Sequence, residues 1–174
     1  PTEVSLARLL AGSGVAVGGR CALSLVDYVD EIMAGGFPGL RHLEGRALER
    51  QLDGYLDRIV DHDLSELGLR VRRPRTVLAW LRAYAAATST TTSWDKIRNA
   101  ATSGVDVKPA KTTTMPYIEL LTALRILDPL DAWLPSHNHL AALNAAPKHH
   151  LADPALAARL VGRTATQLLH GGDA

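Results

Sequence analysis

The chain has 174 residues, of which 47% are hydrophobic and 21% charged, and its formal net charge is +1. These values exclude a disordered chain and a strong global field that would attract nucleic acid or acidic lipid. The single cysteine, Cys21, excludes an internal disulfide and a cysteine-based zinc site, and it suits a cytoplasmic location. No apolar run approaches the roughly 20 residues of a membrane span, so we expect no membrane partner.

Helix signals dominate the N-terminal part of the chain. A short helix is predicted over 4–10, and a glycine-rich turn follows it. Ser24 and Asp27 have the spacing of a capping box, in which each side chain satisfies the backbone of the other. They predict the start of a second helix, which the glycines and the proline of GGFPG (35–39) then stop.

The strongest periodicity lies over 46–67 and predicts one long amphipathic helix. Its apolar stripe consists of Leu48, Leu52, Tyr55, Leu56, Ile59, Val60, Leu64 and Leu67. We expect a homo-oligomer, a dimer through this helix, because apolar surface left uncovered by the chain favours self-association.

Three further helices are predicted after a basic connector at 68–75. Pro74 begins the first of them, and Ser93 caps the second. Thr114 is the predicted cap of the third, with Pro116 tolerated in its first turn.

The remainder of the chain changes character. The segment 126–135 contains two prolines and is predicted to be extended, and 148–153 is predicted to be a short strand. Asp153 then caps a helix whose first residue is Pro154, and a capping-box spacing at 164–167 opens a last short helix.

The predicted fold class is therefore mainly α. Three helices followed by a short two-stranded β-ribbon are typical of a winged helix, and the best domain boundary is the basic connector near residue 70. In a DNA-binding winged helix the third helix enters the major groove. Here the outer surface of that helix is nearly neutral, and phosphate contacts from basic side chains normally dominate affinity for DNA. We therefore expect a protein partner and keep DNA binding as the alternative.

Seven basic residues are the candidates for nucleic-acid contact. They are Arg70, Arg72, Arg73, Arg75, Lys108, Lys111 and Arg125. The arginines precede the first helix of the predicted winged helix, and the two lysines precede the third.

The adjacent His149 and His150 suggest a metal or catalytic cluster. On a strand, however, neighbouring side chains point to opposite faces, so both cannot ligate one metal without distortion. Asp153 is better used as a helix cap. A structural role is therefore predicted for this segment.

Two other clusters are weighed in the same way. His137 and His139 lack a third ligand, which favours a solvated loop. Asp61, His62 and Asp63 would carry a low-ranked hydrolase alternative, but a solvated helix face is the simpler interpretation. No phosphate-binding loop and no nucleophile motif occurs. We therefore assign no catalytic, cofactor-binding or metal-binding residue and no cofactor.

Four segments together resemble bacterial predicted AAA+-type ATPases with a C-terminal DUF4143 domain, especially actinobacterial members. They are GGFPGLRHLEGRALERQLDGYLDRIVDHDLSELG (35–68), TVLAWLRAYAAATSTTTSWDKIRNAAT (76–102), KPAKTTTMPYIELLTALRILDPLDAWLP (108–135) and PKHHLADPALAARLVG (147–162).

The resemblance implies a helical lid-like segment at 1–69, a winged-helix-like domain at 70–152, and the short helices that open the DUF4143 region at 153–174. The ATPase core with its phosphate-binding loop would be missing, so the chain would be a fragment or shortened copy without ATP turnover. The resulting expectation is a non-catalytic protein-interaction or regulatory module that packs against an ATPase core or another protein. A winged-helix nucleic-acid-binding module is the alternative.

Overall fold

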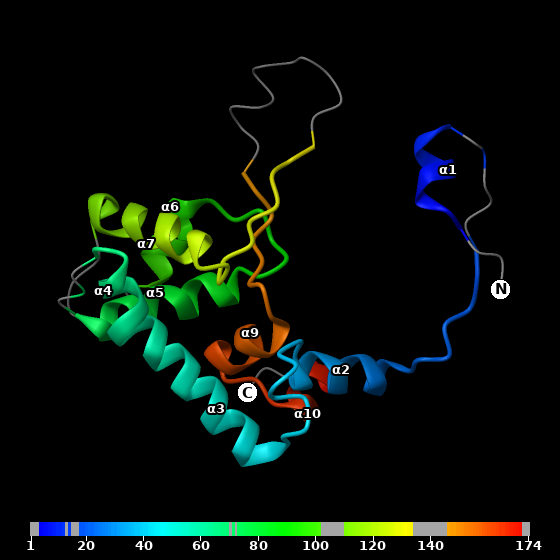
Figure 1. The fold of residues 1–174 in the computed structure, drawn as a ribbon, viewed down its shortest axis with the longest axis horizontal. Coiled ribbons are helices and arrows are strands. Elements are labelled where there is room, and N and C mark those ends of the chain that lie inside the picture. The colour runs from blue at the N-terminus through cyan, green and yellow to red at the C-terminus, as the bar shows by residue number, and fades with distance from the viewer. Residues whose placement is uncertain are drawn as a thin grey trace.

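Helices make up most of the residues that the computed structural model describes, which confirms the mainly α prediction (Figure 1). The structure describes residues 4–12, 14, 18–69, 71, 73–101, 110–133 and 146–171. Among these residues, no helix is both long and apolar enough to cross a membrane.

The first two helices are α1 (Leu6–Leu10) and α2 (Leu25–Ala34). The predicted capping box begins α2, because the Ser24 hydroxyl accepts from the Asp27 amide and the Asp27 carboxylate accepts from the Ser24 amide. Gly35 ends α2 with a φ of 68°. Both predicted boundaries of α2 are therefore confirmed.

The predicted long helix is interrupted. Helix α3 (Gly45–Arg58) continues into one π-helical turn, η1 (Ile59–Asp63), and then α4 (Leu64–Glu66). A π-helical turn adds a residue to the turn, and it lets Ile59, Val60 and Leu64 all remain buried. Most of the predicted stripe is thus covered within the chain, although Leu67 is exposed.

Three helices follow: α5 (Pro74–Ala86), α6 (Trp94–Ala100) and α7 (Lys111–Ala123). Pro74 at the start of α5 and Ser93 as the cap of α6 are as predicted. The prediction for α7 was wrong, because Ala110 precedes its first residue and Thr114 lies inside the helix. The Thr114 hydroxyl donates to the Lys111 carbonyl at 3.2 Å, so this buried hydroxyl is satisfied without capping.

The predicted β-ribbon is reduced to two isolated antiparallel bridges within the described residues, Leu127 with Leu151 and Leu130 with Lys148. The two segments pair as expected, but Pro129 has no amide to donate to a ladder. The His149 amide donates instead to the Thr90 carbonyl on the other side. The winged-helix description therefore stays a prediction.

An aromatic cluster fills the core beside this segment. Trp80 and Tyr84 of α5 stack on Trp94, with ring centroids 6.4 Å and 5.7 Å from it. The buried His149 ring meets Trp94 edge-on at 4.5 Å, and its Nε2 lies 2.7 Å from the Thr92 carbonyl. His149 therefore has a structural role, as predicted.

The chain ends in α9 (Pro154–Val161) and α10 (Ala165–His170). Asp153 caps α9, and Thr164 forms a capping box with Gln167 at α10, as predicted. Helix α9 packs against α5, α2 and α3, and α10 packs against α2. The continuous core cluster includes Leu56 of α3, Leu81 of α5 and Leu156 of α9. The three-part domain division stays a prediction.

Candidate functional site

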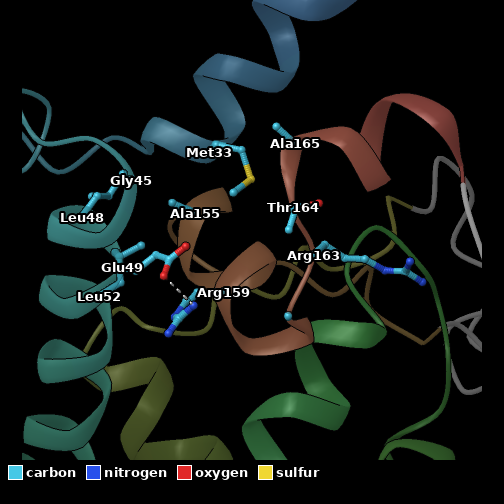
Figure 2. A pocket seen from close by; sticks show the side chains of 11 residues that line it. Met33, Gly45, Leu48, Glu49, Leu52, Ala155, Arg159, Arg163, Thr164 and Ala165 are labelled. Carbon is cyan, nitrogen blue, oxygen red and sulfur yellow. Dashed lines mark ion pairs between the residues drawn. The ribbon is translucent and has the colours of Figure 1, made fainter. Parts of the chain in front are cut away.

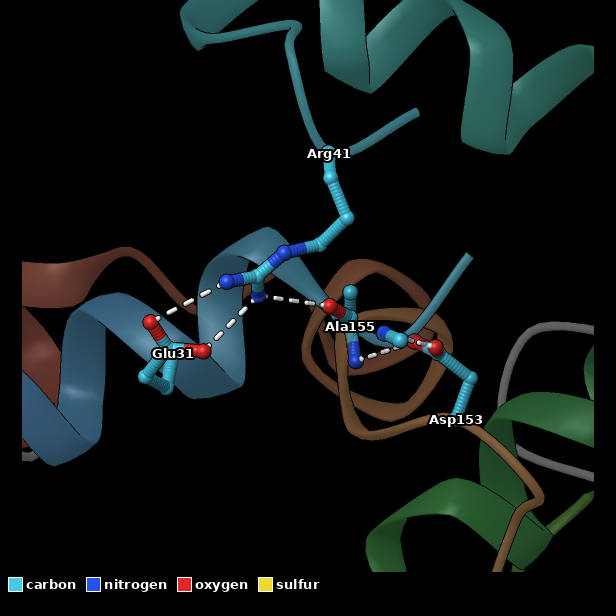
Figure 3. A network of polar contacts seen from close by, with 6 residues as sticks. Glu31, Arg41, Asp153 and Ala155 are labelled. Carbon is cyan, nitrogen blue, oxygen red and sulfur yellow. Dashed lines mark hydrogen bonds and ion pairs between the residues drawn. The ribbon is translucent and has the colours of Figure 1, made fainter. Parts of the chain in front are cut away.

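The buried carboxylate of Asp153 joins the start of α9 to the loop after α2 (Figure 3). One of its oxygens accepts from the amide of Ala155 at 2.8 Å, and the other accepts from the amide of Gly36 at 2.6 Å. Two segments more than a hundred residues apart in the sequence are thus held by one side chain. Asp153 is therefore a structural clamp, and its carboxylate is used in these hydrogen bonds rather than in a cluster with His149 and His150.

Gly35 allows the close approach on which this clamp depends. Its backbone has φ 68° and ψ −176°, a conformation essentially restricted to glycine. A Cβ at this position would lie 2.7 Å from the Asp153 carboxylate and 2.8 Å from the Cβ of Ala155. The first glycine of the GGFPG sequence is therefore required by both backbone conformation and space.

Arg41 ties the same loop to α2 by hydrogen bonds from its exposed guanidinium. Its guanidinium donates to both carboxylate oxygens of Glu31, at 2.8 and 3.1 Å, and to the Gly35 carbonyl at 2.9 Å (Figure 3). These hydrogen bonds lower the pKa of Glu31. The GGFPG loop is thus fixed to α2 as well as to α9.

A pocket of about 270 Å³ opens where α2, α3, α9 and α10 meet (Figure 2). Met33, Leu48 and Leu52 give it an apolar wall, and Glu49 and Arg159 lie at its polar side. Arg159 donates to both carboxylate oxygens of Asp53, at 2.7 and 2.6 Å, and pairs with Glu49 at 3.5 Å. Because two carboxylates of the chain already hold this guanidinium, it is a poor receptor for an anionic ligand.

An apolar groove of about 420 Å³ lies on the other side of α9, and we call it the α2–α9–α10 groove. Its apolar lining includes Ile32, Ala85, Pro154, Ala157, Val161 and Leu168. Ile32, Val161 and Leu168 are each more than a third exposed. The groove therefore presents large apolar side chains to solvent.

The groove continues onto an exposed face of α2. Leu25, Tyr28 and Ile32 are spaced i, i+3 and i+7 and share one face, which we call the α2 stripe. Leu25 is 67% exposed, although Val29 beside the stripe is buried. The packing of α9 and α10 therefore covers only part of the apolar arc of α2. Sequence reasoning missed this surface, although the spacing of the three residues was a visible signal.

The structure places the predicted basic residues that it describes on two different helices or at their ends. Arg73 immediately precedes α5 and Arg75 lies in its first turn, and both are exposed. Lys111 begins α7, whereas Arg125 follows its C-terminal end with a φ of 59°. The length of α7 places these last two about 20 Å apart. Arg70, Arg72 and Lys108 lie outside the described residues, and nucleic-acid binding stays a prediction.

The two other clusters weighed from the sequence were Asp61, His62 and Asp63, and the pair His137 and His139. Asp61 and His62 are exposed on the π-helical turn, and Asp63 pairs with Arg58 at 3.4 Å. Across the located part of the chain, no three His, Cys, Asp or Glu side chains are placed to hold a metal ion. His137 and His139 lie outside the described residues. The hydrolase alternative stays an untested prediction.

The comparisons with known proteins give one match. A family model described as a domain of unknown function, DUF8612, matches residues 25–167. No curated protein and no solved structure matches the chain.

The match overturns the predicted resemblance to AAA+-type ATPases with a DUF4143 domain. The motifs behind that resemblance are helix caps, loop glycines and apolar stripes, which unrelated helical proteins share for the same physical reasons. The matched region extends from the start of α2 into α10, and so includes the clamp and every residue of the groove lining except Leu168. The chain belongs to the DUF8612 family.

Proposed function

We propose that this chain is a non-catalytic protein-interaction module that binds an amphipathic helix in the α2–α9–α10 groove. The observation that carries the proposal is the continuity of the groove with the α2 stripe. Contiguous exposed apolar surface of this kind is typical of binding sites. A groove between helices suits a ligand helix whose apolar residues recur every three or four positions.

The polar groups around the groove support a binding role over a chemical one. Asp153 is committed to the clamp, and Arg159 is held by Asp53. His150 lines the groove, and its backbone carbonyl accepts a hydrogen bond from the hydroxyl of Tyr84. We assign no catalytic, cofactor-binding or metal-binding residue, and we keep the cytoplasm as the proposed location.

A displayed library of amphipathic helical peptides tests the proposal. We expect selection against the chain to enrich helices with apolar residues at i, i+3 or i+4 and i+7. Their affinity should fall at least tenfold, equivalent to about 1.4 kcal/mol, when Ile32→Glu or Leu168→Glu places a charge in the groove.

The control is Met115→Glu, because Met115 is similarly exposed but lies on α7, outside the groove lining. This variant should bind the selected helices as the unsubstituted chain does. Selected peptides that bind all three variants equally well, or a selection that yields no helices, would refute the proposed function.

A further inference from the structure

One part of the α2–α9–α10 groove is polar, whereas the other described residues of its lining are apolar. Thr88, Ser89 and His150 form this part, which we call the polar patch. The three residues come together because the loop after α5 is tied to the extended segment 148–151. The Ser89 amide donates to the His149 carbonyl at 2.8 Å, and the His149 amide donates to the Thr90 carbonyl at 2.9 Å.

His150 faces the groove because its neighbour faces the core. Adjacent side chains of an extended segment point to opposite sides. The His149 ring packs against Trp94 in the aromatic cluster, while His150 lines the groove and is half-buried. Within the described chain, the His150 ring has no hydrogen-bond partner. An imidazole has at least one N–H donor in each protonation state, so His150 offers this donor to a ligand in the groove.

Ser89 and Thr88 add two hydroxyl groups to the polar patch. Ser89 has a φ of 63°, which favours glycine, and such backbone strain is concentrated at functional sites. Its side chain is exposed and makes no hydrogen bond to any residue that the structure describes. The Thr88 hydroxyl is buried without a partner among the same residues, and rotation about χ1 turns it toward the groove. The polar patch therefore holds three donors that the described chain does not use.

The absence of charge in the described lining indicates which ligand group suits these donors. A lysine or arginine of a ligand would meet no carboxylate there to balance its charge. Asp153, on the same segment as His150, is buried in the clamp and does not line the groove. A carboxylate of the ligand accepts several hydrogen bonds and needs no acceptor in return. Hydrogen bonds to a charged group are also stronger than those between neutral groups.

From these observations we infer that the polar patch binds a carboxylate side chain of the helix in the groove, so that the partner is an acidic amphipathic helix. The inference rests on the proposed function and specifies its partner. The apolar lining holds the apolar stripe of the ligand helix, and the polar patch selects an aspartate or glutamate beside that stripe. A helix without this carboxylate would cover the three donors and leave them unpaired, which costs binding free energy.

The selected peptides give the first test. We expect an aspartate or glutamate to recur at one position beside the apolar stripe. One such helix is then compared, by fluorescence anisotropy, with a version in which glutamine replaces the glutamate. The glutamate helix should bind the unsubstituted chain about tenfold more tightly, as expected for hydrogen bonds to a charged group. Selected helices without a recurrent acid, or equal affinities for the two versions, overturn the inference.

Two variants of the polar patch assign the preference to its side chains. Ser89→Gly removes the hydroxyl and suits the backbone conformation, so this variant should fold normally. His150→Phe removes the N–H donor and keeps an aromatic ring. In each variant the preference for the glutamate helix should fall by at least about threefold. Circular dichroism verifies the fold, and an unchanged preference in both variants overturns the inference.

Thr88→Val and Thr122→Val form a matched pair. Both hydroxyls are buried without a partner among the described residues, but of the two only Thr88 lines the groove. Thr88→Val should reduce the preference for the glutamate helix, and Thr122→Val should leave it unchanged. Equal reductions would show that the loss comes from the stability of the fold and would contradict the assignment to the polar patch.

The two proposals fail in different ways. If helices bind and Ile32→Glu weakens their binding, but glutamate and glutamine versions bind equally, the proposed function stands and the inference is wrong. If no helix binds, both are wrong.

Discussion

Helices α3 and α2 both carry an apolar stripe, but only one of the stripes is buried. Leu48, Leu52 and Leu56 of α3 are almost fully covered, whereas Leu25 and Tyr28 of α2 are about half exposed or more. Helix α3 contacts α9 and continues into a turn that contacts α5, while the main helix contacts of α2 among the described residues are with α9 and α10. An apolar stripe therefore indicates that a face favours burial, and the arrangement of the other helices decides whether the same chain covers it.

The comparison first predicts that a substitution in the core lowers the free energy of unfolding much more than a substitution in the α2 stripe does. Trp80→Ala should lower the free energy of unfolding by about 4 kcal/mol, because it removes a fully buried ring from the aromatic stack. Leu25→Ala, in the α2 stripe, should change it by less than about 0.5 kcal/mol. Urea denaturation measures both. Equal losses would show that the α2 stripe is covered within the chain.

The second prediction concerns the clamp that joins α2 to α9. Gly35→Ala should destabilise the fold by about 3 kcal/mol, since the backbone conformation is strained for alanine and the added Cβ displaces the Asp153 carboxylate. Gly162→Ala is the matched control. Its φ of 67° is also left-handed, but a Cβ there meets no atom within 4 Å, so about 1 kcal/mol is expected. Thermal unfolding of the two variants checks the difference, and equal losses would contradict the role given to the clamp.

The third prediction is a loss of core stability at alkaline pH. Burial raises the pKa of Tyr84 to about 12, above the ordinary value of 10. The folded state therefore holds this proton more tightly than the unfolded state does. The resulting stabilisation is fully present below pH 10 and is lost as the pH rises toward 12, amounting to roughly 2–3 kcal/mol.

Urea denaturation at a series of pH values, with Tyr84→Phe as the comparison, measures this loss. The variant should be less stable at neutral pH, by about 1 kcal/mol, because it lacks the hydrogen bond to the His150 carbonyl. It should also lose less stability above pH 10. Parallel curves for the two proteins would assign the alkaline loss to other groups.

The smallest effect is expected at the surface ion pair between α3 and α9. Hydrogen bonds from Arg159 lower the pKa of Asp53. Their contribution is present above the ordinary carboxyl pKa of about 4 and is lost as the pH falls through the lowered value. Because the Asp53 side chain is 47% exposed, Asp53→Asn should cost at most about 1 kcal/mol at pH 7. Chemical denaturation at pH 7 and at acidic pH should show the difference in stability between the two proteins shrink as the pH falls.

Several element boundaries were predictable because their signals are local. Ser24, Ser93, Asp153 and Thr164 each accept a hydrogen bond from a backbone amide two or three residues ahead. Such a contact depends on only one turn of chain, so the residue types suffice to predict it. Thr114 also has a hydroxyl that could cap a helix, but α7 begins three residues earlier, at Lys111, so Thr114 lies inside the helix.

The candidate site was not predictable in the same way. The sequence favoured Asp153 as a cap, but only the fold places the Gly36 amide on its second oxygen. The spacing of Leu25, Tyr28 and Ile32 indicates a shared face, but not which part of it α9 and α10 leave open. The wrong family resemblance has a related cause, because caps and stripes report local physics that many helical proteins share.

The sequence by itself determined the helical class of this protein, the caps of its helices and the apolar stripes that form its core. These features follow from backbone hydrogen bonding and from periodicity over a few turns. Only the tertiary structure decided where the π-helical turn falls, which carboxylate clamps α2 to α9, and which apolar faces stay open. Each of these depends on contacts between residues far apart in the chain, and the free energy of such contacts is set by how whole elements pack.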